Sequence, residues 1–306
     1  MRNSFFIVII LSLLTFFSCS DGDIITVEFD FDDTFESCGN LVFFKTKADP
    51  AESLSLQITS PALTLEDLLN VGSDNTLTTT RTINGTSNTF NYRTYSTLPS
   101  NLFCNDVPPA DIDITNDLES TSGTVIITTV LTEDDNDGVP AALEGQDPNG
   151  DGNFDDAIDT DGDGIPDYKD ADDDGDNVLT KNENPDPNGD GILDDAQDTD
   201  GDGTPDYLDD DDDGDDVLTR DEENSSQDQN PGNDVTNSDV GADYLNPDVK
   251  TSVPATAYRV HTIYKTYVVT LVINNISLPN IYQDVFDFGI LEDSSLSTSI
   301  TVTPAF

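Results

Sequence analysis

The sequence predicts a mainly β protein in which a β-sandwich domain is interrupted by a long, irregular insertion. Three observations predict this fold class. The two ends of the 306-residue chain are rich in Thr, Ser, Ile, Val, Phe and Tyr, residues that favour β-strands. Between them, residues 133–249 hold 42 Asp and Glu against three basic residues, a net charge of −39. Strand patterns run up to this acidic segment and resume after it, so it is expected to connect two strands.

Alternating apolar residues predict strands in residues 19–132. Val27, Phe29 and Phe31 alternate with acidic residues, which is the period-two pattern of a half-buried strand. Other segments with strand signals lie at residues 41–44, 54–58, 90–95 and 124–131. Residues 64–70 are expected to form one helical turn capped by Thr64, and residues 70–88 to form a polar loop.

The last part of the chain, residues 250–306, is also β-prone. Residues 258–278 are long enough for two strands, and residues 298–303 are expected to supply another. So few residues cannot bury a core alone. We therefore expect them to complete an Ig-like sandwich begun by residues 19–132, with residues 133–249 inserted between two of its strands. Three modules in series are the alternative.

The N-terminus has the features of an export signal. An apolar run at residues 5–17 follows Arg2 and is too short to span a bilayer comfortably. Ser18 then precedes Cys19. This arrangement resembles a bacterial lipoprotein signal, although Phe16 stands where that family usually has Leu; the resemblance implies removal of residues 1–18 and lipidation of Cys19. The acidic residues 20–23 resemble the tag that sends some lipoproteins to the outer face of the outer membrane. An ordinary secretory signal is the alternative.

Two further cysteines, Cys38 and Cys104, are expected to form one disulfide, because the signal places the chain in an oxidising compartment. Two free buried thiols are the alternative. The chain has no paired cysteine motif and no cluster of Cys with His, so a zinc site is not expected.

An internal repeat dominates the acidic segment. Residues 147–170 read DPNGDGNFDDAIDTDGDGIPDYKD, and 39 residues later residues 186–209 read DPNGDGILDDAQDTDGDGTPDYLD. Calcium prefers six to eight oxygen ligands, which a tight loop supplies from alternate side chains around a sharp bend. A repeat built from Asp, Gly and Asn therefore predicts an array of calcium sites.

Three loops resemble EF-hand loops, with ligands expected at positions 1, 3, 5 and 12. In two of them Asn177 and Asp216 stand at position 6, where Gly is usual; both residue types tolerate a positive φ. The loop that opens the segment begins with Glu. The candidate ligands are Glu133, Asp135, Asp137 and Glu144; Asp172, Asp174, Asp176 and Glu183; and Asp211, Asp213, Asp215 and Glu222.

A second loop type has the pattern D-x-D-x-D-G-x-x-D-x-x-D and resembles the thrombospondin type 3 repeat. That resemblance implies little regular secondary structure and many bound calcium ions. Its candidate ligands are Asp159, Asp161, Asp163, Asp167 and Asp170, and Asp198, Asp200, Asp202, Asp206 and Asp209. Two looser copies offer Asp147, Asn149, Asp151 and Asp155, and Asp186, Asn188, Asp190 and Asp194.

A solvated, disordered acidic tract is the alternative to a calcium array, because composition alone favours disorder. The register favours the array, because a disordered tract requires neither Gly at the sixth position of a loop nor Pro166 and Pro205 at matching sites. Magnesium is disfavoured because it gives up its waters reluctantly. Few apolar residues lie in each repeat, so calcium binding is expected to supply most of the folding free energy of the segment.

The charge and the motifs also limit the function. Nucleic acid and anionic membrane surfaces would repel the acidic segment. His261 is the only histidine, and the sequence has no nucleophile elbow or phosphate loop, so we expect no catalytic residues. We expect a lipid-anchored outer-membrane protein exposed at the cell surface, whose calcium array is a spacer or adhesion element that contacts a surface protein or glycan. A glycan- or protein-binding β-module and an accessory subunit of a surface enzyme are the alternatives.

Overall fold

The computed structural model describes residues 29–306 except 40, 106, 108, 111, 225 and 226. The expected signal at residues 1–18, the lipidation site Cys19 and the first strand residue Val27 lie outside these residues. Ten strands and one short α-helix are present in the described part, with bounds β1 (Thr34–Cys38), β2 (Val42–Lys47), β3 (Glu52–Ile58), α2 (Leu65–Leu69), β4 (Thr76–Ile83), β5 (Asn88–Tyr95), β6 (Ile114–Ser120), β7 (Gly123–Asp134), β8 (His261–Leu278), β9 (Ile281–Leu291) and β10 (Ser297–Val302).

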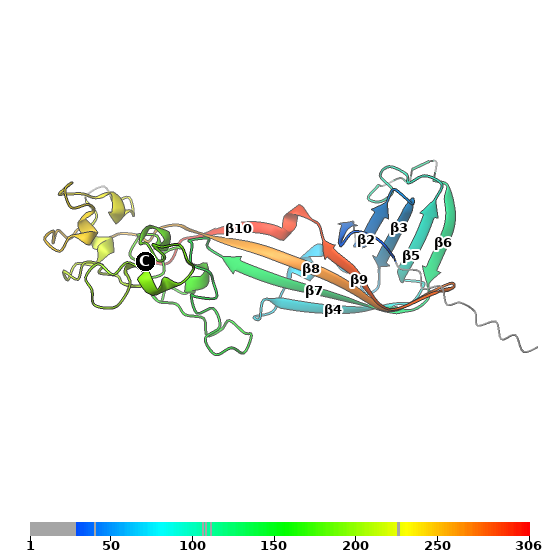
Figure 1. Ribbon diagram of the computed structural model, residues 1–306, viewed down its shortest axis with the longest axis horizontal. Coiled ribbons are helices and arrows are strands. Elements are labelled where there is room, and N and C mark those ends of the chain that lie inside the picture. Colours follow the sequence, from blue (N-terminus) through cyan, green and yellow to red (C-terminus); the bar gives the residue numbers. More distant parts are fainter. Residues whose placement is uncertain (1–28, 40, 106, 108, 111, 225–226) are drawn as a thin grey trace, which may run out of the picture.

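The strands form one sheet, which confirms the mainly β prediction. Their order is β4-β7-β8-β9-β1-β2-β3-β5-β6, and β10 pairs with β8. Strands β4, β7, β8 and β9 form the first half of this sheet, which is the long ribbon in the middle of Figure 1. Strands β2, β3, β5 and β6 form the second half, which is the shorter set of strands at one end. Strand β1 joins the halves because it pairs antiparallel with β2 and parallel with β9. A disulfide between Cys38 and Cys104 ties the end of β1 to a following loop.

The core lies between the two halves of the sheet. Phe35 of β1 contacts both Phe43 of β2 and Phe288 of β9 edge to face, and all three rings are almost fully buried. The same cluster contains 24 buried residues, all of which lie outside residues 135–260. The β-sheet therefore has a hydrophobic core of its own, independent of the acidic segment.

Strands β7 and β8 connect this sheet to the acidic segment. They pair antiparallel from Thr124 opposite Asn274 to Asp134 opposite Tyr264. The chain between them, residues 135–260, forms an irregular body at the end of the β7–β8 ribbon (Figure 1). We call residues 135–249 the repeat array and residues 250–260 the return segment. The regular structure described within the array consists of three-residue 3₁₀ turns, η2 (Asp167–Lys169), η3 (Thr180–Asn182), η4 (Leu193–Asp195), η5 (Asp206–Leu208), η6 (Thr219–Asp221), η7 (Pro231–Asn233) and η8 (Asp243–Leu245).

Several sequence-based expectations need correction. Phe29 and Phe31 precede the first strand and are not part of one, which corrects the predicted strand. Phe29 is nevertheless buried against Phe90 and Phe286, so the alternating pattern reflects packing in the core and not pairing in the sheet. Residues 70–88 are not a loop throughout, because their threonines form strand β4 at the edge of the sheet. Residues 258–278 form one 18-residue strand, β8, where two were expected. The helical turn capped by Thr64 is confirmed, and Asp67 completes its capping box.

No helix in the described part of the chain is both long and apolar enough to cross a bilayer. A 3₁₀ turn, η9 (Ser294–Leu296), is the last described helical element and leads directly into β10.

Candidate metal centres of the repeat array

All seven predicted loops share one backbone conformation. Their fourth and sixth residues have a positive φ, which bends the chain sharply twice within each loop. Glycine adopts this conformation without steric cost, and Asn and Asp tolerate it better than most residues. Asn177 and Asp216 at position 6 both have φ of 75°, as the sequence led us to expect. The pairs are Asn136 and Gly138, Gly150 and Gly152, Gly162 and Gly164, Gly175 and Asn177, Gly189 and Gly191, Gly201 and Gly203, and Gly214 and Asp216.

The bends let backbone N–H groups hold the acidic side chains. In the loop that begins at Asp172, the Asp176 N–H donates to Asp174 Oδ1 at 3.2 Å and the Val178 N–H donates to Asp176 Oδ1 at 2.6 Å. The same Asp176 N–H also donates to Asp172 Oδ1, and the Asn177 N–H donates to Asp172 Oδ2. One oxygen of Asp174 and of Asp176 is thereby fixed, while the other is buried without a hydrogen-bond partner.

Acidic oxygens converge at five places in the described chain, with the grouped atoms within 4.8 Å of one another. Three of these groups are largely buried. We call Asp135, Asp137 and Glu144 the first site, Asp174, Asp176 and Glu183 the second site, and Asp211, Asp213 and Asp215 the third site. The other two groups are more exposed and consist of Asp159, Asp161 and Asp163, and of Asp198, Asp200 and Asp202.

The buried sites are electrostatically incomplete. Burial and neighbouring carboxylates raise the pKa of Glu144 to about 10 and that of Glu222, beside the third site, to about 8. Buried oxygens of Asp135, Asp137 and Glu144 have no hydrogen-bond partner. Because burying an unpaired carboxylate is costly, such a group needs either protons or a cation. The donors are all oxygens, which hard cations such as calcium prefer, so these residues fit that ion.

The structure gives several predicted ligands other partners. Glu133 accepts from Lys265 at 2.7 Å, which ties the first loop to β8, and it also lies 3.5 Å from Lys169. Both carboxylate oxygens of Asp167 accept from Thr160, and both of Asp206 accept from Thr199. Asp209 accepts from the N–H of Asp211. These residues hold the loops in place and do not join any of the five groups.

The two looser copies form the same turns at the protein surface. Asp147 and Asp186 each accept from three backbone N–H groups of their loops, with Asn149 and Asn188 accepting from one. Asp155 and Asp194 are exposed. Since these copies are exposed and contain Asn where the others have Asp, they provide less negative charge than the buried sites.

The structure also reveals residues that the sequence reasoning missed. Asp173 and Asp212 are each only 2% exposed, and none of their carboxylate oxygens has a hydrogen-bond partner. An oxygen of Asp212 converges with those of the second site. The available signal was their equivalent position, 39 residues apart, as the second residue of each loop.

A third, degenerate copy of the second loop type is present as well. Its Thr236 donates from both N–H and hydroxyl to Asp243, as Thr160 does to Asp167 and Thr199 to Asp206. Tyr244 follows, in the place of Tyr168 and Tyr207. Val235 stands where the other two copies have the candidate ligands Asp159 and Asp198, so this copy keeps the framework and lacks the first candidate ligand.

Neighbouring loops pack so closely that some positions admit only glycine. A side-chain carbon added to Gly175 would collide with the Asp161 carboxylate, whereas one added to Gly162 would meet open space. Both glycines have a positive φ, of 68° and 77° respectively. The Asp161 carboxylate therefore lies directly over the next loop.

We expect Gly175→Ala to destabilise the array far more than Gly162→Ala. Both substitutions carry the left-handed cost of roughly 1–2 kcal/mol, but only Gly175→Ala also displaces Asp161 from the group that it forms with Asp159 and Asp163. Thermal unfolding in saturating calcium measures the difference. Equal midpoints for the two variants would show that the loops are not packed as described.

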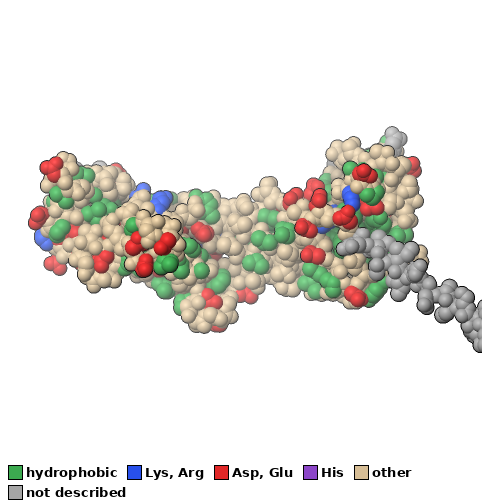
Figure 2. Space-filling view, in the orientation of Figure 1, with side chains coloured by type: hydrophobic (Ala, Val, Ile, Leu, Met, Phe, Trp, Pro, Cys, Tyr) green, Lys and Arg blue, Asp and Glu red, His purple; other side chains and the backbone are tan. Residues whose placement is uncertain are grey.

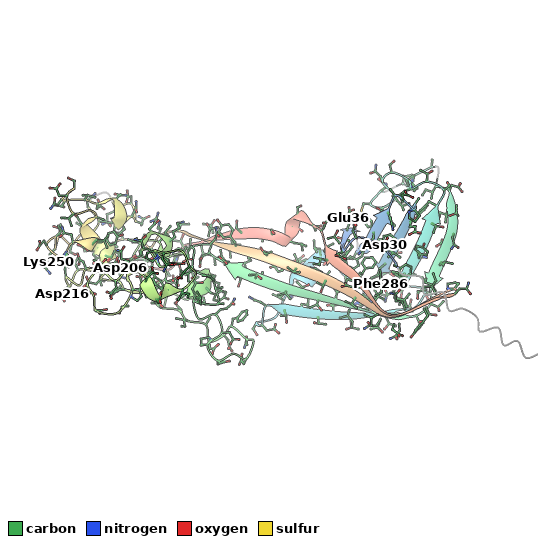
Figure 3. The ribbon with its side chains drawn as sticks, in the orientation of Figure 1. Asp30, Glu36, Asp206, Asp216, Lys250 and Phe286 are labelled. Carbon is green, nitrogen blue, oxygen red and sulfur yellow. A yellow bond between two sulfur atoms is a disulfide. The ribbon has the colours of Figure 1, made fainter. Side chains whose placement is uncertain are left out.

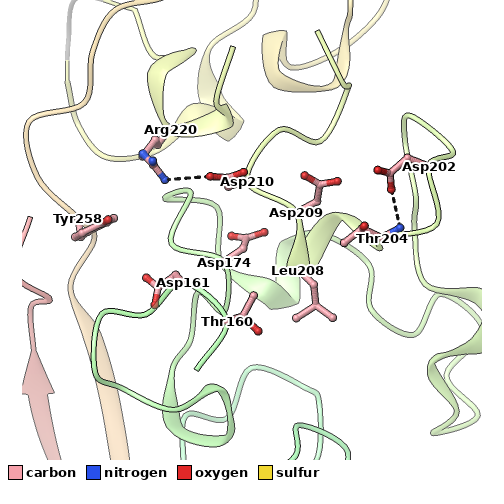
Figure 4. A pocket seen from close by; sticks show the side chains of 10 residues that line it. All are labelled: Thr160, Asp161, Asp174, Asp202, Thr204, Leu208, Asp209, Asp210, Arg220 and Tyr258. Atoms are coloured by element: carbon pink, nitrogen blue, oxygen red, sulfur yellow. Dashed lines mark hydrogen bonds and ion pairs between the residues drawn. The ribbon is translucent and has the colours of Figure 1, made fainter. Parts of the chain in front are cut away.

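An acidic cleft of about 450 Å³ lies between the loops (Figure 4). Asp161, Asp174 and Asp202 line it from three different loops. Arg220 lies 3.7 Å from Asp210 at its edge, and Tyr258 of the return segment also lines it. The cleft is thus the space around which the repeats are arranged.

The return segment and the start of β8 bind the array along its length. Lys250 Nζ donates to the Asp215 carbonyl at 2.6 Å. The N–H groups of Val253 and Ala255 donate to Asp221. Closer to the sheet, Arg259 donates to the Asn177 carbonyl, and the buried His261 lies against the Asp170 carboxylate. The array is therefore attached to the sheet by side chains as well as by its two chain connections. Figure 2 shows acidic side chains in separate spots at both ends of the molecule.

Comparison with known proteins identifies one part of the array. A family model described as BamM C-terminal matches residues 134–194, from the last residue of β7 through the first and second sites. No curated protein and no solved structure matches the chain. The match leaves most of the sheet outside the matched region, and the EF-hand and thrombospondin type 3 resemblances stay predictions.

Proposed function

We propose that this chain is a calcium-binding, lipid-anchored protein of the bacterial outer membrane whose array is a rigid spacer or adhesion element at the cell surface. The observation that carries the proposal is the set of buried, unpartnered carboxylate oxygens in loops of one conformation. Calcium bound there would neutralise the carboxylates and cross-link the loops. We propose no enzymatic activity.

The arrangement of the chain supports a spacer. Asp30, near the start of the described chain, lies in the half of the molecule away from the array. Asp206 and Asp216 of the array, with Lys250 of the return segment, mark the other end (Figure 3). A lipid on Cys19 would hold the sheet near the membrane and direct the array outward. The proposed partner of the array is another surface protein or a glycan.

The family match supports the location. Its name, BamM C-terminal, associates the matched residues 134–194 with the bacterial outer membrane. Because this segment contains the first two sites, the same residues carry both the proposed location and the proposed metal binding.

Calorimetric titration of the mature chain, residues 19–306, with calcium tests the proposal. We expect several ions to bind, with dissociation constants on the order of 10⁻⁴ to 10⁻³ M for an extracellular module. Small-angle scattering should show a smaller radius of gyration once the sites are filled. Absence of binding in millimolar calcium would make the segment an acidic tether and refute the proposal.

A further inference from the structure

The second site is completed by a residue from a different loop. Asp174, Asp176 and Glu183 come from one loop, whereas Asp212 is the second residue of the loop 39 residues further along. Asp212 is 98% buried, and both of its carboxylate oxygens lack a hydrogen-bond partner. Its backbone N–H donates to Thr219 Oγ1 at 3.3 Å, so its own loop fixes where it stands.

Asp173 lies beside the first site in a comparable position, although its oxygens are outside the group that converges there. Asp173 occupies the same position in its loop as Asp212 does, and it is equally buried, with two unpartnered oxygens. Its N–H donates to Thr180 Oγ1 at 3.2 Å, which matches the bond between Asp212 and Thr219. Asp173 and Glu144 of the first site line one small cavity of about 190 Å³.

We propose that the metal sites of the array are interlocked: Asp173 and Asp212 are calcium ligands donated to the first and second sites by the loop that follows each of them. This inference rests on the proposed calcium binding and adds the coupling between sites. Each of these sites spans two loops, so filling one site orders part of the next. Adjacent sites must then bind calcium with positive cooperativity, and the coupling is reciprocal.

The last site of the array has no ligand from a following loop, as interlocking predicts for a terminal site. The degenerate copy follows the preceding one after 37 residues, so Val249, which carries no charge, stands in the place of Asp212, and the third site receives no equivalent carboxylate. Lys250 instead lies 3.7 Å from the Asp215 carboxylate of that site. The third site is the terminal one, and we infer that it binds calcium more weakly than the second.

Two tyrosines allow the first and second sites to be observed separately. Tyr207 lines the same cavity as Glu144 and Asp173. Tyr244, in the degenerate copy, is buried and lies near the carboxylates of Glu183 and Asp212, which help to raise its pKa. Terbium, a luminescent substitute for calcium, is excited by nearby tyrosines. The luminescence that Tyr244→Phe removes therefore reports the second site, and the luminescence that Tyr207→Phe removes reports the first.

The test compares Asp212→Asn with Asp216→Asn in the full mature chain. Each variant removes one negative charge from the same loop, but Asp216 is exposed and Asn suits its positive φ. We expect Asp212→Asn to weaken terbium and calcium binding at the second site about tenfold or more, because calcium affinity follows the charge and number of the ligands. Asp216→Asn should titrate like the wild-type protein, and the third site should still fill in both variants.

Two other results would overturn the inference, and a third would pass the decision to a second variant. If Asp212→Asn titrates like Asp216→Asn while the wild-type protein binds calcium, the sites are not interlocked and the proposed function still stands. If the wild-type protein binds neither calcium nor terbium, both proposals fail. If Asp212→Asn loses the third site as well, its own loop has been disrupted; Asp173→Asn, observed through Tyr207, then decides, and an unchanged first site refutes interlocking.

Discussion

Removal of calcium at neutral pH is expected to unfold residues 135–249 while the β-sheet remains folded. The reason is that the two parts have very different apolar interiors. The main core cluster contains 24 buried residues and none of them belongs to the array. Within the array the buried hydrophobic residues are Val139, Ile165, Tyr168, Val178, Tyr207 and Tyr244. So small an interior cannot offset a backbone ordering cost of roughly 1–2 kcal/mol per residue.

Bound calcium supplies the stabilising free energy that the small apolar interior of the array does not provide. A ligand present at 100 times its dissociation constant adds about 2.7 kcal/mol for each site, and it also removes the repulsion among the carboxylates. The loops contribute little without it, because their N–H groups already hold the carboxylates in positions where they repel one another. The metal is therefore expected to decide whether the array folds.

Hydrogen exchange of the full mature chain, with calcium and with excess chelator, measures this effect. We expect amides of the array loops to lose protection in chelator and those of β3, β5 and β9 to keep it. Magnesium at the same ionic strength is the control for simple charge screening. Protection of the array in chelator, or simultaneous loss of protection in the sheet, would contradict the prediction.

Strands were predictable where apolar and polar residues alternate. Strands β5 and β7 bury every second residue over much of their length, and in β3 the buried apolar residues Leu54, Leu56 and Ile58 alternate with polar ones. Strands β4 and β6 lie at the two edges of the sheet, where Ile83 and Ser120 are the buried residues. An edge strand that buries so little leaves no apolar period in the sequence, so residues 70–88 were expected to form a loop and no strand was predicted at residues 114–120.

The sequence predicted those features of the candidate site that depend on residues within a single loop. Ligand spacing within a loop specified the turns, because positions 4 and 6 must accept a positive φ. Interactions between loops left no such pattern. Asp167 has ligand spacing but accepts from Thr160, and Glu133 binds Lys265 of β8. Conversely, Asp212 lies outside the ligand spacing of its own loop and reaches the preceding site only through the fold.

The calcium-free array is expected to become more stable as the pH is lowered from 8 to 5, and the calcium-loaded array less stable. Burial and nearby carboxylates raise the pKa of Asp173 to about 11, that of Glu144 to about 10 and that of Asp161 to about 7. Circular dichroism of the tyrosines and hydrogen exchange, each at pH 5 and pH 8 with and without calcium, measure the two opposite trends.

The sign follows from proton binding in the two states. Unfolded Asp and Glu have pKa values of about 3.9 and 4.3, so above about pH 4 the folded, metal-free array binds more protons than the unfolded chain. Its stability is fully present below those values and is lost as the pH rises through the raised folded values. Calcium reverses the trend because its ligands must be deprotonated, so protons compete with the ion. A calcium-free array that is less folded at pH 5 than at pH 8 would show that these carboxylates are not buried together without metal.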